Sequence, residues 1–171
     1  MVRLDRRVTF SWTGLALAAA ILLPNALVVL LPPREGLRVL ASTGPVPGVV
    51  ERIGQVGCST AAVLWGPDRG AAPWGWTMLA AVIAYAALWV RYVLGGRRAG
   101  SLLSPVWGVP VPMAVLPVVA FGCGAVWSAS PWLAAATAVL AVGHLPNSLR
   151  TGRLLRADPA RTGGVSPDGR R

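Results

Sequence analysis

PWGWTMLAAVIAYAALWVRYVLGG, residues 73–96, contains a single charged side chain, Arg91. An α-helix rises about 1.5 Å per residue, so a run of this length can cross the hydrocarbon core of a bilayer, which is about 30 Å thick. Its tryptophans and tyrosines lie mostly near its ends, where membrane helices are enriched in them. Arg91 lies near the C-terminal end, from which a long side chain can reach the interface. The stretch therefore predicts a transmembrane helix.

The composition of the whole chain has the same bias. Hydrophobic residues make up 54% of the 171 residues and charged residues 13%, whereas a soluble domain has about 25% charged residues. We therefore expect an all-α, polytopic transmembrane bundle of four to five membrane helices within residues 10–150. The predicted segments are 10–32, 48–66, 73–95, 104–127 and 131–149, between a basic N-terminus at 1–9 and a basic tail at 151–171 that we expect to be disordered.

Prolines modify two of these segments. Pro24 falls inside the first segment and is expected to interrupt it. The fourth segment contains several prolines, so its first part is expected to be extended or re-entrant rather than helical. The second segment is the least apolar, and the sequence leaves open whether it crosses the membrane fully.

The net charge is +10, and arginine supplies all of the positive charge. A basic chain can bind nucleic acid, but here the arginines cluster at the two ends and between apolar runs, as in the cytoplasmic loops of membrane proteins. We therefore expect a lipid bilayer as partner, no nucleic acid, and a multi-pass protein of the cell membrane. The basic C-terminal tail is expected in the cytoplasm, while the side of the N-terminus and the oligomeric state stay open.

VVERIGQVGC, residues 49–58, contains Glu51, the only acidic residue in a predicted membrane segment. On a helix, Glu51, Gln55 and Cys58 share a face, which Arg52 flanks. A charged side chain at membrane depth costs roughly 2.5–3.5 kcal/mol. Either Glu51 pairs with Arg52 or another arginine and marks the start of the helix, or it is a proton donor or polar anchor in an internal pocket. In such a pocket, desolvation would favour the protonated carboxyl group.

Three further polar residues belong to apolar segments. His144 is the only histidine, and without a second cluster of ligands it cannot build a metal site. It is either a hydrogen-bonded interface residue or a partner for Glu51 across the bundle. Asn25 and Asn147 each follow a Leu-Pro pair, where an amide can bond backbone carbonyls that proline leaves free. No metal and no cofactor are expected.

Most of the eight tryptophans lie at segment ends, as interfacial residues do. Trp89 and Trp107 do not, and either can line a pocket, where an aromatic face stabilises a cation by about 0.5–2 kcal/mol. A buried acid with indole walls suits proton-initiated cyclisation of an isoprenoid chain through carbocations. The predicted catalytic residues are Glu51 and His144, and the predicted substrate-binding residues are Asn25, Arg52, Gln55, Trp89, Trp107 and Asn147.

LLPNALVVLLPP (22–33), VVERIGQVGC (49–58), the proline-rich fourth segment and GHLPNSLRT (143–151) resemble a family of small bacterial five-helix membrane proteins of actinobacterial type. Most members have no assigned function. Some proteins of this size and helix count resemble membrane-bound terpene cyclases acting on prenylated indole or diketopiperazine substrates. The resemblance implies a hydrophobic isoprenoid-type ligand and Glu51 as the acid. The alternative is a non-enzymatic membrane protein: an accessory or structural subunit, or a transporter component.

Overall fold

The computed structural model describes residues 8–34, 45–65, 72–106 and 108–157, and helices contain 84% of these residues. The described residues form no strand; they contain one isolated β-bridge, between Val106 and Val109. The all-α class is therefore confirmed. The helices are α1 (Trp12–Leu30), α2 (Pro45–Trp65), α3 (Ala72–Leu94), α4 (Ala99–Leu103), α5 (Pro112–Ser128) and α6 (Pro131–Ala157).

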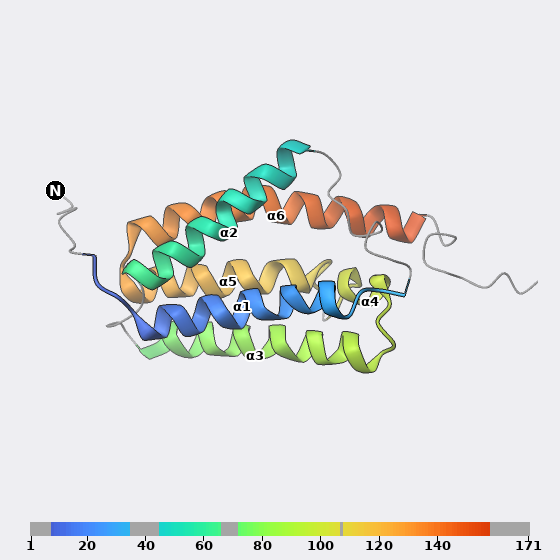
Figure 1. Ribbon diagram of the computed structural model, residues 1–171, viewed down its shortest axis with the longest axis horizontal. Helices are drawn as coiled ribbons and strands as arrows, with labels where there is room; N and C mark the ends of the chain where they lie inside the picture. Colours follow the sequence, from blue (N-terminus) through green and yellow to red (C-terminus); the bar gives the residue numbers. More distant parts are fainter. Residues whose placement is uncertain (1–7, 35–44, 66–71, 107, 158–171) are drawn as a thin grey trace, which may run out of the picture.

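The long helices form an elongated bundle. Figure 1 shows α1, α3 and α5 running along the long axis with α6 beside them, while α2 crosses α6 at an angle. The short α4 lies at one end of the bundle, where it contacts α3 and α6. We refer to this end as the α4 end.

Two of the described helices, α1 and α3, are long and apolar enough to cross a membrane, and α5 is a shorter apolar helix. Neither α2 nor α6 belongs to this set. The low mean hydropathy of α2 agrees with the sequence, in which its segment is the least apolar.

The proline predictions have different outcomes. The expected interruption at Pro24 is wrong, because α1 continues through that residue to Leu30. A proline inside a helix removes one backbone hydrogen bond, and neighbouring helices let an apolar bundle tolerate that loss. The fourth segment does contain a non-helical part: residues 104–106 and 108–111 are not helical, and α5 begins at Pro112.

The first part of the predicted tail is helical, because α6 continues to Ala157. Thr151, Gly152 and Leu155 are buried, whereas Arg153 and Arg156 are exposed. This stretch is therefore an amphipathic end of α6 whose narrow buried stripe packs near α4. The stretch is polar on average, and for this reason the sequence predicted a tail and not a helix. The rest of the predicted tail, 158–171, lies outside the described residues, as does the predicted N-terminal stretch at 1–7.

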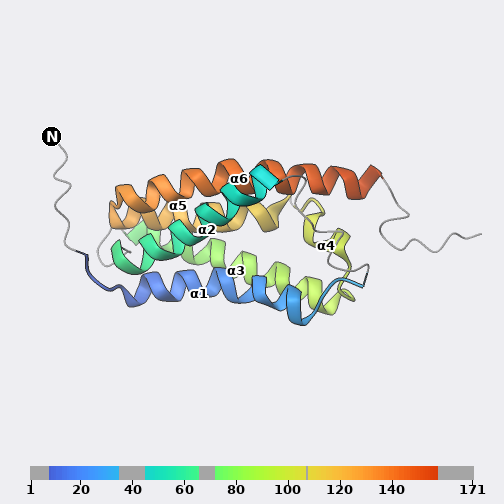
Figure 2. The same ribbon diagram turned by 45° about the horizontal axis from the view of Figure 1, so that its top comes forward.

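Backbone contacts join α1 and α2 at the end of the bundle away from α4. The backbone nitrogens of Thr9 and Ser11 donate to the carbonyl oxygens of Leu64 and Val63, at 3.1 and 2.8 Å. A Cβ atom at Gly14 would overlap the backbone of α2. Figures 1 and 2 both show that the other, N-terminal end of α2 lies away from α1. The two helices therefore diverge towards the α4 end.

Candidate functional site

A cavity of about 350 Å³ lies between the helices in the half of the bundle where α1 and α2 diverge. Small-molecule sites have volumes of about 300–1,000 Å³, so the cavity is at the small end of that range. All six helices contribute to its lining: Leu22, Asn25 and Val28 from α1, Glu51 and Gln55 from α2, Tyr85 and Trp89 from α3, Leu102 and Leu103 from α4, Met113 and Ala114 from α5, and His144, Asn147, Ser148 and Thr151 from α6.

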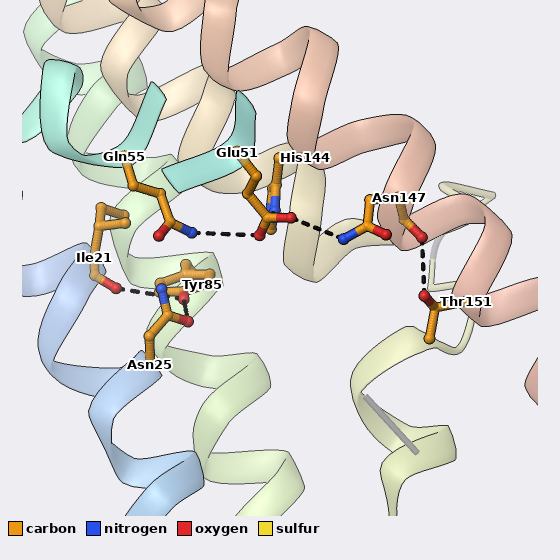
Figure 3. A network of polar contacts seen from close by, with 8 residues as sticks. All are labelled: Ile21, Asn25, Glu51, Gln55, Tyr85, His144, Asn147 and Thr151. Atoms are coloured by element: carbon orange, nitrogen blue, oxygen red, sulfur yellow. Dashed lines mark hydrogen bonds and ion pairs between the residues drawn. The ribbon is translucent and has the colours of Figure 1, made fainter. Parts of the chain in front are cut away.

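The carboxyl group of Glu51 lies on the wall of this cavity and is held by α6 (Figure 3). Its Oε1 lies 2.8 Å from Nδ1 of His144, and its Oε2 accepts a hydrogen bond of 2.8 Å from Nδ2 of Asn147. His144 and Asn147 are three residues apart on α6, so they project from the same side of that helix. The side chains of Glu51 and His144 are 18% and 19% exposed.

One further hydrogen bond reaches the carboxyl group of Glu51, and another lies beside it on α6. Nε2 of Gln55, one turn along α2, donates to Oε1 of Glu51 at 3.4 Å. The hydroxyl of Thr151 donates to the backbone carbonyl oxygen of Asn147 at 3.0 Å. The carboxyl group of Glu51 is therefore held by side chains of both helices, Gln55 of α2 and His144 and Asn147 of α6, as an acid–base residue needs to be.

The contact between Oε1 of Glu51 and Nδ1 of His144 fits three proton arrangements. They are a carboxylate beside a neutral imidazole protonated on Nδ1, a carboxylate beside an imidazolium, and a carboxylic acid beside a neutral imidazole. The last two hold one proton more than the first, so a change between them gives or takes up a proton at the cavity wall. A carboxyl group and an imidazole in hydrogen-bonding contact are a common general acid–base combination.

A second polar group comes from α1 and α3 (Figure 3). The hydroxyl of Tyr85 donates to Oδ1 of Asn25 at 2.9 Å, and it also lies 3.4 Å from the backbone oxygen of Ile21. The ring of Trp89 meets the ring of Tyr85 edge to face, with centroids 6.2 Å apart. The cavity therefore has aromatic rings on α3 as well as the Glu51–His144 pair on α2 and α6.

Small residues let α2 approach α6 closely. A Cβ atom at Gly54 would lie 2.4 Å from the Cα atom of Leu140. On the same face, Cys58 is fully buried and its thiol lies 3.8 Å from the hydroxyl of Thr137. The stripe that the sequence placed on one face of α2 is therefore divided: Glu51 and Gln55 line the cavity, and Cys58 packs against α6.

Six of the eight predicted site residues line this one cavity: Asn25, Glu51, Gln55, Trp89, His144 and Asn147. Arg52 does not line it; its side chain is exposed, and Glu51 is hydrogen-bonded to His144 instead. Trp107 lies outside the described residues. The prediction that Arg52 binds the ligand is thus not supported by its position.

Tyr85, Ser148 and Thr151 also line the cavity, although they were not among the predicted site residues. A signal for Tyr85 is present in the sequence. Tyr85 and Trp89 are four residues apart and therefore share a face of α3, and a phenol hydroxyl inside an apolar helix usually needs a hydrogen-bond partner.

Comparisons of the chain with protein-family models, curated proteins and solved structures find no match. The class of protein is therefore defined by its fold and site alone. It is an α-helical bundle with a partly open, small-molecule-sized cavity and an acid–histidine pair on its wall.

Proposed function

We propose that the chain is a multi-pass membrane enzyme in which Glu51 and His144 transfer a proton to a lipophilic substrate in the cavity. One observation carries this proposal. The only acidic residue and the only histidine of the described residues meet at 2.8 Å on the wall of a cavity of about 350 Å³. Ionisable groups inside a membrane bundle commonly mark functional sites.

The exposure of the apolar helices supports a membrane location. Only 22% of the most apolar window of α1 and 33% of that of α3 are buried, whereas the core helix of a soluble protein is mostly buried. Leu23, Val29 and Ile83 are 67%, 70% and 60% exposed. Apolar surface of this extent usually contacts lipid or another protein. We propose that α1, α2, α3, α5 and α6 cross the membrane, with the α4 end at the cytoplasmic face.

The most specific form of the proposal is a terpene cyclase acting on a farnesyl-type prenyl chain. The pair donates its proton to an epoxide oxygen or a terminal alkene of the substrate. An internal alkene attacks the resulting carbocation and closes a ring, and the final cation returns a proton from carbon to Glu51. The net change is an isomerisation, so no cofactor is consumed. An epoxide is the more accessible substrate because its oxygen is more basic than an alkene.

The aromatic residues on α3 suit this chemistry. Indole and phenol faces attract cations, and Tyr85 and Trp89 both line the cavity. The non-enzymatic alternative predicts that Glu51 pairs with an arginine and that no closed apolar cavity is present. The cavity is partly open and partly polar, so it does not decide between the two; the Glu51–His144 contact favours the enzyme.

The experiment is turnover by membranes that contain the full chain. Prenylated indole with a terminal epoxide is supplied, and products of unchanged mass but altered retention are sought by liquid chromatography and mass spectrometry. Glu51→Gln should reduce turnover by about a hundredfold or more, since general acid–base catalysis contributes roughly 10²–10⁴. Thr60→Ala, on the exposed side of α2, is the matched control. Equal turnover by Glu51→Gln and the unaltered chain would exclude this mechanism.

A further inference from the structure

The arginines of the described residues all belong to one half of the bundle. They are Arg34, Arg52, Arg91, Arg97, Arg98, Arg150, Arg153 and Arg156. The other end, formed by residues 8–14, 58–65, 72–78 and 122–135, contains no charged side chain. The only described acid, Glu51, is already bonded to His144 and Asn147. The positive charge at the α4 end is therefore not compensated by a described carboxylate.

Two of these arginines contact the end of α4 and the residue that follows it, next to the cavity. Nη2 of Arg91 on α3 donates to the hydroxyl oxygen of Ser104 at 3.3 Å, and Nη1 of Arg156 on α6 donates to the backbone oxygen of Leu103 at 3.3 Å. Leu103 lines the cavity. The two guanidinium groups therefore contact consecutive residues at the boundary between cavity and surface.

Both arginines retain capacity for a ligand. A guanidinium group has five N–H donors in a planar fork that matches phosphate oxygens, and each of these contacts uses one donor. The cavity lining from α4 and α5, namely Leu102, Leu103, Met113 and Ala114, is apolar. The apolar part of the cavity therefore lies next to two exposed guanidinium groups, those of Arg91 and Arg156.

We propose that the cavity binds an amphipathic ligand with a phosphate head group, which Arg91 and Arg156 hold while its hydrocarbon chain extends towards Glu51 and His144. This inference rests on the proposed function and gives the prenyl substrate a phosphate, in place of indole, as its polar end. The phosphate can belong to a free prenyl diphosphate or to a membrane phospholipid. In both cases the head group is fixed at the α4 end, and the far end of the chain meets the proton donor.

The test measures binding to the full chain in a neutral detergent by isothermal titration calorimetry. Farnesyl diphosphate and farnesol have the same hydrocarbon chain and differ in the phosphate. We expect farnesyl diphosphate to bind at least about tenfold more tightly, since hydrogen bonds to charged groups are the stronger ones. The double variant Arg91→Gln/Arg156→Gln should remove that preference. Arg150→Gln, exposed on a different side of α6, should keep it.

Two further measurements complete the test. The first controls for loss of folding, and the second identifies the source of the phosphate. Arg91→Lys/Arg156→Lys keeps the charges but loses the planar fork, so it should bind farnesyl diphosphate with intermediate affinity even if the glutamine pair is unstable. In nanodiscs, competition by phosphatidylglycerol but not phosphatidylcholine assigns the site to a lipid head group, and absence of competition assigns it to a free diphosphate.

Equal affinity for farnesol and farnesyl diphosphate would overturn the inference. An equal loss in Arg150→Gln would also overturn it, because the effect would then reflect general surface charge. These failures leave the proposed function intact if turnover still depends on Glu51. Conversely, phosphate preference without Glu51-dependent turnover of either the prenylated indole epoxide or the epoxide of farnesyl diphosphate would overturn the proposed function and retain the ligand class.

Discussion

A Cβ atom at Gly143 would lie 2.5 Å from the backbone nitrogen of Glu51 and 2.8 Å from its Cα atom. Backbone atoms cannot rotate away as a side chain can, so only glycine allows α2 and α6 to approach this closely here. Gly54 has the same role one turn along α2, against Leu140. The contact between Glu51 and His144 therefore depends on two residues that have no side chain.

Gly143→Ala should push α2 away from α6. Overpacking a close contact costs about 1–3 kcal/mol, and the added separation would lengthen the hydrogen bond between Glu51 and His144. We expect a lower free energy of unfolding in mixed micelles together with lower turnover. Gly100→Ala is the control, since nothing lies within 4 Å of its Cβ position, and alanine favours helix. Equal stability of the two variants would contradict this account of the contact.

Glu51 and His144 should be energetically coupled. His144→Ala removes the short hydrogen bond to Oε1 of Glu51 and leaves that oxygen only the 3.4 Å contact from Gln55, and a hydrogen bond to a charged group contributes about 1.5–3 kcal/mol. Glu51→Gln removes the acceptor from His144 in turn. The double variant should therefore lose less stability than the sum of the single variants. The measurement is a double-mutant cycle of unfolding free energies, and strict additivity would show that the 2.8 Å contact has no energetic consequence.

Tyr85→Phe should affect the ligand more than Tyr92→Phe does. Both hydroxyls are hydrogen-bonded, to Asn25 and to the backbone oxygen of Leu31, so each loss should cost about 1 kcal/mol of stability. Only Tyr85 lines the cavity. We expect KM to rise in Tyr85→Phe and to stay unchanged in Tyr92→Phe. Parallel changes in the two variants would indicate a purely structural role for Tyr85.

The charge asymmetry among the described residues predicts the orientation in the membrane. Arginine-rich ends of membrane bundles stay in the cytoplasm, so a cysteine introduced at Gly100 in α4 should react with a membrane-impermeant maleimide only after cells are permeabilised. A cysteine at the exposed Thr9 should react in intact cells. The native Cys58 and Cys123 are buried, which limits their background reaction. The reverse labelling pattern would place the α4 end outside.

The helices themselves are largely visible in the sequence, because long apolar runs and their proline boundaries are local features. The run at 73–95 corresponds closely to α3. The helical end of α6 was missed because its buried residues form only a narrow stripe among arginines. The average polarity of such a segment does not indicate a packed helix. The spacing of its apolar residues does so better.

The candidate site is harder to predict than the helices, because its residues come from helices that are far apart in the sequence. The residue types suggested Glu51 and His144, but two pairings of Glu51 stayed open in the sequence. Choosing between them requires knowing that Gly54 and Gly143 bring α2 against α6. Arg52 is adjacent to Glu51 in sequence yet exposed in the structure, since consecutive residues of a helix point about 100° apart.

Two parts of the site differ in how freely they can diverge among related sequences. Substitution at Gly54 or Gly143 moves a helix, so the position of the proton donor is constrained by the backbone. Val28, Leu102 and Met113 meet the cavity only through apolar side chains, and exchanges among such residues usually cost less than about 1.5 kcal/mol when volume is conserved. Related proteins could thus acquire new ligands through substitutions that change the size of the apolar walls. The position of the proton donor would stay the same, because Gly54 and Gly143 fix the contact between α2 and α6.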